Sequence, residues 1–344
     1  MAIQCLGLPA WWDKVVKDKL ARNENPYTEE FFEDLGNFYS AMADAWPGKA
    51  RILTIGGETA GAGPFATMLE PRLSKLAHDI FKKKRPEVRF ALCLGEGQGW
   101  RLPYTRKMIP LLMPYADMVG GDIYRSALGE PEVGEVRQRI LEAQDWAKQY
   151  RVSQDFFIPE SYGGELKYAE PLDSPESVQR ACHTVRHIIL SKSVPGVISY
   201  GYNRAAGGVS QRVTVDSSLW KYYADGHCEP RPALAAFSAM TRFLANTTDP
   251  VYLHPHDDFY ALVFRKERGT RAVFWSVANE PAKFRLKLPA HAMLYDAVGE
   301  DRGEETGEVT LSASDDPTYV VTDADAEKLA AAMSNATFLK ERAR

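Results

Sequence analysis

The chain has 344 residues, of which 45% are hydrophobic and 26% are charged, and its formal net charge is −4. This length and composition are sufficient to bury a large core, which excludes a disordered protein. The dispersed basic residues exclude a nucleic-acid partner, and no apolar run approaches the roughly 18 residues that a membrane span needs. The four cysteines lie far apart and are interpreted as free thiols.

Short apolar runs alternate with amphipathic helical patterns from the first residue to about residue 245. This alternation is typical of a parallel sheet with crossover helices. Strands are predicted at residues 3–8, 51–56, 88–94, 118–124, 156–160 and 197–202. Helices are predicted at 28–47, 68–84, 133–150, 174–189 and 232–245. Thr28 and Ser174 mark two helix starts, since their hydroxyls cap free backbone N–H groups.

After residue 250 the pattern changes to alternating strands separated by turn residues, as an antiparallel sandwich requires. These strands are predicted at residues 259–265, 271–277, 283–288, 292–296, 308–312 and 318–321. The predicted fold class is therefore α/β, a TIM-type (β/α) barrel followed by an antiparallel β-sandwich. The predicted domains are a barrel over 1–248, a β-sandwich over 249–322 and a helix or tail over 323–344.

Two glutamates follow apolar strands directly. Glu58 comes after the strand at 51–56, and Glu160 ends the strand at 156–160. In a (β/α) barrel the chemistry gathers where the strands end, so such carboxylates are better catalytic candidates than those on helices. Two predicted strands lie between them, which places the two glutamates on the first and fourth of four successive strands. A retaining glycosidase uses two carboxyl groups about 5 Å apart.

Five segments in order resemble the clan A glycoside hydrolases, of the family 39 and family 5 type. Residues 3–11 resemble the third barrel strand, 26–46 the following helix, 116–124 strand six and 197–202 strand eight, and 230–237 resemble the Pro-x-Pro-Ala start of the final helix. In that clan the acid/base ends strand four and the nucleophile ends strand seven. The resemblance therefore implies Glu58 as acid/base, Glu160 as nucleophile, and retaining cleavage of a β-linked glycoside without metal or organic cofactor.

The chain departs from the clan pattern at several positions. Gly57 precedes Glu58 where the clan carries Asn, and Asp122 stands where strand six usually offers His. If residue 3 begins the third strand, strands one and two have no counterpart, and a barrel incomplete at the N-terminus is predicted. If the two strands are missing from the sequence, a signal peptide would be missing with them. The expected protein is therefore soluble, and both a cytoplasmic and a secreted location stay open.

Aromatic side chains near the strand ends are candidates for stacking on sugar rings, although aromatic residues also pack in barrel cores. The candidate substrate-binding residues are Trp11, Trp100, Asp122, Tyr124, Tyr162, Tyr200, Tyr202 and Asn203, of which Asp122 and Asn203 are the partners for sugar hydroxyls. A carbohydrate is thus the expected partner, and a homo-oligomer is compatible with the sequence.

Three alternatives stay open. Glu96 also ends a strand and competes with Glu58 for the acid/base role. The chain is otherwise a non-catalytic carbohydrate-binding or structural barrel, or an enzyme that uses Glu96 or Asp122 with a metal.

Other motif matches are rejected. Residues 279–281 spell the acid/base tripeptide Asn-Glu-Pro, but they lie between antiparallel strands, where Asn and Pro form turns. His183 and His187 lie one helical turn apart without the carboxylate of a zinc motif, so a core or surface role is preferred.

Overall fold

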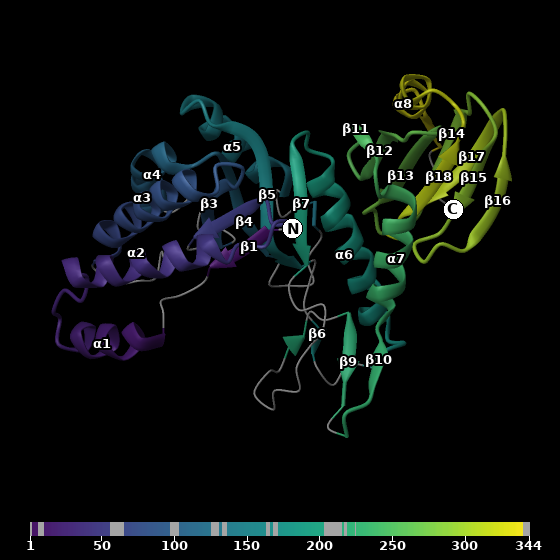
Figure 1. Ribbon diagram of the computed structural model, residues 1–344. Coiled ribbons are helices and arrows are strands. Elements are labelled where there is room, and N and C mark those ends of the chain that lie inside the picture. Colours follow the sequence, from purple (N-terminus) through teal and green to yellow (C-terminus); the bar gives the residue numbers. More distant parts are fainter. Residues whose placement is uncertain are drawn as a thin grey trace. The chain divides into compact units, whose positions relative to one another are not determined.

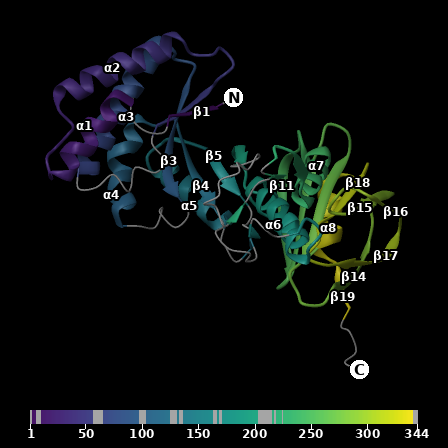
Figure 2. The same ribbon diagram turned by 90° about the horizontal axis from the view of Figure 1, so that it is seen from below.

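The structure is a computed structural model of the chain (Figure 1, Figure 2). It describes residues 2–5, 10–55, 65–96, 103–124, 131–132, 136–162, 166–167, 171–202, 215–216, 219–223 and 225–339. The chain divides into two compact units. The first comprises residues 1–124, 138–161 and 196–201, and the second comprises residues 125–137, 162–195 and 202–344.

A six-stranded sheet forms the first unit, with the strands in the order in which they occur in the sequence (Figure 1). They are β1 (Ala2–Cys5), β2 (Ile52–Ile55), β3 (Arg89–Glu96), β4 (Met118–Tyr124), β5 (Ser153–Tyr162) and β7 (Val197–Tyr202). Adjacent pairs from β1 to β4 are parallel. The α/β fold with a parallel half-barrel that the sequence predicts is thus confirmed.

Helices connect these strands. They are α1 (Ala10–Ala21), α2 (Glu29–Asp44), α3 (Ala66–Lys84), α4 (Pro103–Leu112), the short 3₁₀ helix η4 (Met113–Tyr115) and α5 (Val136–Gln149). Thr28 caps α2 as predicted, since its Oγ1 accepts from the Phe31 N–H at 3.4 Å. The helices α1 and α4 were not predicted.

The two faces of the sheet pack differently. Leu53 of β2 and its register partner Phe90 of β3 belong to a large core shared with α1, α2 and α3. On the opposite face, one residue from each of four adjacent strands forms a second, smaller cluster: Ile52, Ala91, Met118 and Phe157. Because successive side chains alternate between faces, this second cluster defines the face turned away from α2 and α3.

Two glycines allow β5 to lie close to both of its neighbours. A Cβ at Gly120 of β4 would collide with the carbonyl oxygen of Phe157, and a Cβ at Gly201 of β7 would collide with that of Pro159. The Phe156 N–H also donates to the carbonyl of Gly196 at 2.8 Å. Contacts therefore advance in the same direction along β5 and β7, as in a parallel pair.

Among the described strands of this sheet, β1 and β7 stand at the two edges. In β7, Ile198 is 45% exposed and Ser199 is exposed as well. A parallel sheet is usually covered on both of its faces, so an exposed apolar side chain makes β7 unusually open.

The second unit contains α6 (Pro175–Lys192), α7 (Pro232–Leu244) and two antiparallel sheets. One sheet has the order β11 (Thr248–His256), β12 (Phe259–Arg265), β13 (Thr270–Ser276), β18 (Thr318–Thr322), β15 (Ala292–Tyr295), β16 (Asp301–Glu305). The other has the order β17 (Glu308–Ala313), β14 (Ala282–Lys287), β19 (Thr337–Phe338). The antiparallel sheets predicted after the half-barrel are confirmed.

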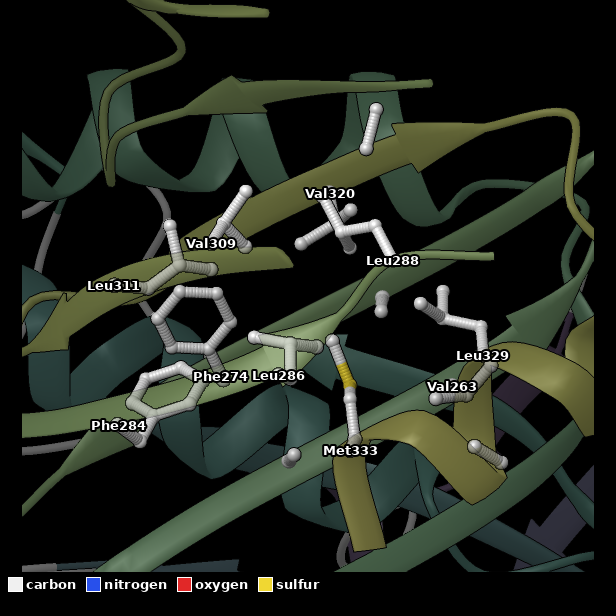
Figure 3. Close-up of a cluster of buried hydrophobic side chains, with 14 of the residues drawn as sticks. Val263, Phe274, Phe284, Leu286, Leu288, Val309, Leu311, Val320, Leu329 and Met333 are labelled. Atoms are coloured by element: carbon white, nitrogen blue, oxygen red, sulfur yellow. The ribbon is translucent and has the colours of Figure 1, made fainter. Parts of the chain in front are cut away.

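The side chains between these two sheets form one hydrophobic core (Figure 3). Phe274 of β13 lies edge-on to Phe284 of β14, with ring centroids 5.2 Å apart. Leu329 and Met333 of α8 (Ala326–Ser334) reach into the same cluster. The helix predicted after residue 322 is therefore part of this core, where the sequence left a helix or a tail open.

Short strand pairs complete the second unit: β6 (Leu166–Lys167) with β8 (Val215–Asp216), and β9 (Trp220–Tyr222) with β10 (Cys228–Pro230). In the described part of the chain, no helix is both long and apolar enough to cross a bilayer.

Candidate functional site

The connections of the sheet differ in length between its two ends. Those that enter a strand from a helix are short, at residues 45–51, 85–88, 116–117, 150–152 and 193–196. Of those that leave a strand, the four at residues 56–65, 125–135, 163–174 and 203–231 are longer than any of these, whereas those at 6–9 and 97–102 are not. In (β/α) barrels the loops that follow the strands carry the functional residues. The candidate site is therefore at the carboxyl ends of the strands.

Several predicted site residues lie near the carboxyl ends of adjacent strands. Glu160 belongs to β5, Asp122 and Tyr124 to β4, and Tyr200 and Tyr202 to β7. Since the sheet order is β3, β4, β5, β7, these strand ends are neighbours. These residues, which were chosen from the sequence, thus belong to strand ends that the topology places side by side at the carboxyl end of the sheet.

Contacts fix the level of these strand ends relative to each other. The Ser161 hydroxyl of β5 donates to the carbonyl of Ile123 in β4. Glu96, the last residue of β3, is the register partner of Asp122. Glu160 lies directly before Ser161, so the backbones of Glu96, Asp122 and Glu160 stand at about the same height on three adjacent strands.

The side chain of Asp122 is buried at the carboxyl end of the sheet. It is 1% exposed and lies two positions beyond Gly120 and four beyond Met118, so it shares their face of the sheet. The Cys93 thiol of β3 lies on the same face, with its Sγ 4.0 Å from Oδ2 of Asp122. A carboxyl group is thus buried on the face turned away from α2 and α3, at the carboxyl end of the sheet.

The remaining predicted residues have different places. Tyr200 is half-buried, next to Gly201. Trp11 lies in the first turn of α1, and Tyr162 is the last residue of β5. Glu58, Trp100 and Asn203 lie outside the described residues.

A groove of about 570 Å³ lies on the helical side of the first unit, lined by Glu29, Phe32, Glu33, Gly36, Asn37, Arg72 and Leu76. All of these residues belong to α2 or α3, and none belongs to a strand end. Arg72 already pairs with Glu29 at 2.9 Å and lies 3.8 Å from the centre of the Phe32 ring. Its charge is thus engaged, and the groove is not the candidate site.

A buried polar network in the second unit escaped the sequence prediction. The Glu132 carboxylate accepts from the Trp275 indole at 2.7 Å and from Arg186 at 3.1 Å. Both charged side chains are almost fully buried, Glu132 at 2% and Arg186 at 0% exposure, and burial lowers the pKa of Arg186 to about 10. Arg186 and Trp275 lie 54 and 143 positions after Glu132 in the sequence, so no local pattern reveals these pairs.

The described residues hold no group of three or more His, Cys, Asp or Glu side chains arranged for a metal ion. His183 and His187 are both fully buried in α6. They occupy the core position that the sequence left as one of two alternatives.

No protein-family model matches the sequence, and no curated protein matches it as a relative. Similar solved structures do exist. A glucosidase from Croceicoccus marinus has a TM-score of 0.58 at 13% identity, over 84% of this chain and 74% of that one. A glycoside hydrolase family 30 subfamily 8 xylanase from Clostridium acetobutylicum has a TM-score of 0.52 at 13% identity, over 85% and 71%.

A third solved structure has the same fold. It is a β-porphyranase of glycoside hydrolase family 86 from Bacteroides plebeius, with a TM-score of 0.56 at 11% identity, over 85% of this chain and 60% of that one. At these identities the likeness establishes the fold alone: a parallel half-barrel followed by antiparallel sheets.

Proposed function

We propose that the protein is a retaining glycoside hydrolase that cleaves a β-linked glycoside or polysaccharide by double displacement. The observation that carries this proposal is the place of Glu160 near the carboxyl end of β5, between the strand ends that carry Asp122 and Tyr200. Its support is the order of the strands, which brings these residues to neighbouring strand ends, together with a fold of the kind in which strand ends carry the chemistry.

In the proposed reaction, Glu160 attacks the anomeric carbon while Glu58 donates a proton to the leaving glycosidic oxygen. This step breaks the glycosidic bond and forms a glycosyl ester on Glu160. Glu58, now a carboxylate, takes a proton from water, and the resulting hydroxide displaces Glu160 from the sugar. Both residues return to their starting states, and the anomeric configuration is retained.

Strand order constrains the proposed pair. Glu58 follows β2 and Glu160 lies in β5, with β3 and β4 between them. Three steps of ~4.8 Å between strands give about 14 Å along a flat sheet. Retention therefore requires a sheet curved enough to bring the two carboxyl groups to about 5 Å, as in a barrel.

The substrate would lie across these strand ends. Asp122 and Asn203 would accept hydrogen bonds from sugar hydroxyls, and Tyr200 and Tyr202 would cover an apolar sugar face. Further stacking residues in the proposal are Trp11, Trp100, Tyr124 and Tyr162. The mechanism requires no metal or organic cofactor.

The test uses aryl β-glycosides and azide. Glu160→Ala should lose nearly all turnover, and added azide should restore some by forming the α-glycosyl azide, because azide enters from the face that the nucleophile occupied. Glu58→Ala should keep turnover of substrates with activated leaving groups, and azide should give the β-glycosyl azide. Glu280→Ala is the matched control, since Glu280 is exposed in a turn of the antiparallel sheets.

Two outcomes would redirect the proposal. A wild-type protein that binds a sugar but cleaves none, and binds it equally after Glu160→Ala, would be a carbohydrate-binding barrel. The register pairing of Glu96 with Asp122 favours a further candidate, a metal enzyme. In that case activity would vanish with a chelator, return with a divalent cation and depend on Glu96.

A further inference from the structure

The end of β5 is held against β4 by a hydrogen bond from a side chain. The Ser161 hydroxyl, on a fully buried side chain, donates to the carbonyl oxygen of Ile123 in β4. A buried hydroxyl almost always has such a partner, because leaving it without one costs free energy. Here the acceptor belongs to the backbone of the neighbouring strand, so the bond joins two strand ends. Ile123 and Ser161 both belong to the first unit.

Pro159 interrupts the backbone pairing of β5 two residues before this bond. Proline has no N–H group, so a strand that contains it offers one donor fewer to its neighbours. Within sheets, proline is therefore found mainly in edge strands and at bulges. The strand β5 is not an edge, since it lies between β4 and β7. The Ser161 hydroxyl thus supplies a donor just beyond the position at which the backbone lacks one.

The other side of β5 is held by close packing against β7. A Cβ on Gly201 of β7 would collide with the carbonyl oxygen of Pro159, so only glycine fits at this approach. In the sequence, Glu160 is the single residue between Pro159 and Ser161. Both neighbours of Glu160 are therefore fixed, Pro159 against β7 and Ser161 against β4.

We propose that Ser161 is a positioning residue for Glu160, the nucleophile of the proposed reaction. Its hydroxyl holds the end of β5 against β4, and because the two residues share a peptide bond, it fixes the Glu160 backbone directly. In this role Ser161 touches no substrate. Reacting groups must be held within about 0.5 Å of the productive geometry by the residues around them. The inference rests on the proposed function.

The experiment compares Ser161→Ala with Ser74→Ala in the full chain. Ser161→Ala removes the hydroxyl and adds no atom, so the strand keeps its packing and loses the bond to Ile123. Ser74→Ala is the matched control, because Ser74 is also a buried serine of the first unit but lies within α3, away from the strand ends. Circular dichroism and thermal melting first establish that each variant folds, and all rates are measured well below the melting temperatures.

The readout is the covalent capture of Glu160 by an aryl β-glycoside that carries fluorine in place of the 2-hydroxyl. The probes are the dinitrophenyl glucoside and xyloside, of which the one that matches the aryl glycoside cleaved by the wild type is used. Attack by the carboxylate expels dinitrophenolate and leaves a glycosyl ester, which the fluorine protects from water. The rate of ester formation at saturation reports the attack alone, and its concentration dependence gives the dissociation constant of the probe.

Ser161→Ala should slow ester formation at saturation by about 10- to 100-fold, since a small misplacement of a reacting group has effects of this size. The dissociation constant of the probe should stay close to that of the wild type, because the groups that contact the sugar are unchanged. Ser74→Ala should match the wild type in both quantities. Mass spectrometry of peptides establishes that the ester is on Glu160.

The outcomes separate this inference from the proposed function. If the wild type forms the ester on Glu160 and Ser161→Ala forms it equally fast, Ser161 is merely structural, and the inference is overturned while the proposed function stands. A variant in which only the dissociation constant rises overturns the inference as well. If the wild type neither cleaves an aryl glycoside nor forms the ester, the proposed function fails and the role of Ser161 fails with it.

Discussion

Tyr260 of β12 shows how packing changes the chemistry of one residue. Its ring stacks on Trp275 at 5.8 Å and on His254 at 4.5 Å between centroids. Burial raises the pKa of the Tyr260 phenol to about 12, and the nearby Glu132 carboxylate acts in the same direction. The neutral phenol therefore persists in the folded protein at pH values at which a free tyrosine is ionised.

This shift predicts an alkaline effect on stability. A pKa raised by folding gives a stabilising contribution that is fully present below pH about 10 and is lost as the pH rises through about 12. In a tyrosinate absorbance titration, Tyr260→Phe should remove part of the component that ionises late. If the absorbance change at high pH were the same in Tyr260→Phe as in the wild type, burial would not raise the pKa of Tyr260.

Candidate site residues differ in how far the sequence reveals them. Glu160 was predicted because a carboxylate at the end of an apolar strand is a local pattern, and Asp122 because of its place in the segment that resembles strand six. Glu132 and Trp275 were not, because each looks ordinary in its own segment and only the folded chain brings them together.

At the scale of elements, β5 lies against two strands that each carry a glycine at the point of closest approach. Gly120→Ala and Gly201→Ala should each lower the free energy of unfolding by about 1–3 kcal/mol, because the added methyl group meets a backbone carbonyl that cannot move freely. Urea denaturation measures this loss.

Gly48→Ala is the control for these two variants, since nothing lies within 4 Å of an added Cβ there. Its unfolding midpoint should stay close to that of the wild type. If Gly120→Ala and Gly201→Ala behave like the control, the close approach of β5 to its neighbours does not constrain the sheet.

The alternating pattern of the sequence predicted all six strands of the half-barrel but not every helix. In α1, Trp12, Val16 and Leu20 recur at helical spacing and reach the core, yet the apolar run before them continues without a capping residue. In α4, Pro110 stands inside the helix, where a proline normally indicates a break. Tertiary packing overrides both signals, and a single sequence does not contain it.

At the scale of the whole molecule, contacts join residues on both sides of the proposed domain boundary after residue 248. Arg186 and Glu132 take partners from beyond that point, as does Cys182, whose thiol lies 2.7 Å from Asp316. The order of strands followed from the sequence, whereas these long-range pairs did not.

A fragment of residues 1–248 should therefore lack a cooperative thermal transition. In the fragment Glu132 would lose the Trp275 indole and Arg186 would lose the Asp315 carbonyl, and a buried charged group that loses a hydrogen-bond partner is strongly destabilising. Differential scanning calorimetry and size-exclusion chromatography of this fragment beside the full chain provide the measurement. A sharp transition and a monomeric elution volume would show that the first 248 residues fold independently.

The openness of β7 has a consequence for how the protein behaves in solution. Natural proteins protect the edge strands of a sheet with charged residues, proline or a covering element. The segment from Val197 to Tyr202 contains neither a charge nor a proline, and Ile198 adds an exposed apolar side chain. At high protein concentration this strand is the expected starting point for edge-to-edge association, so colloidal stability depends on what lies next to β7.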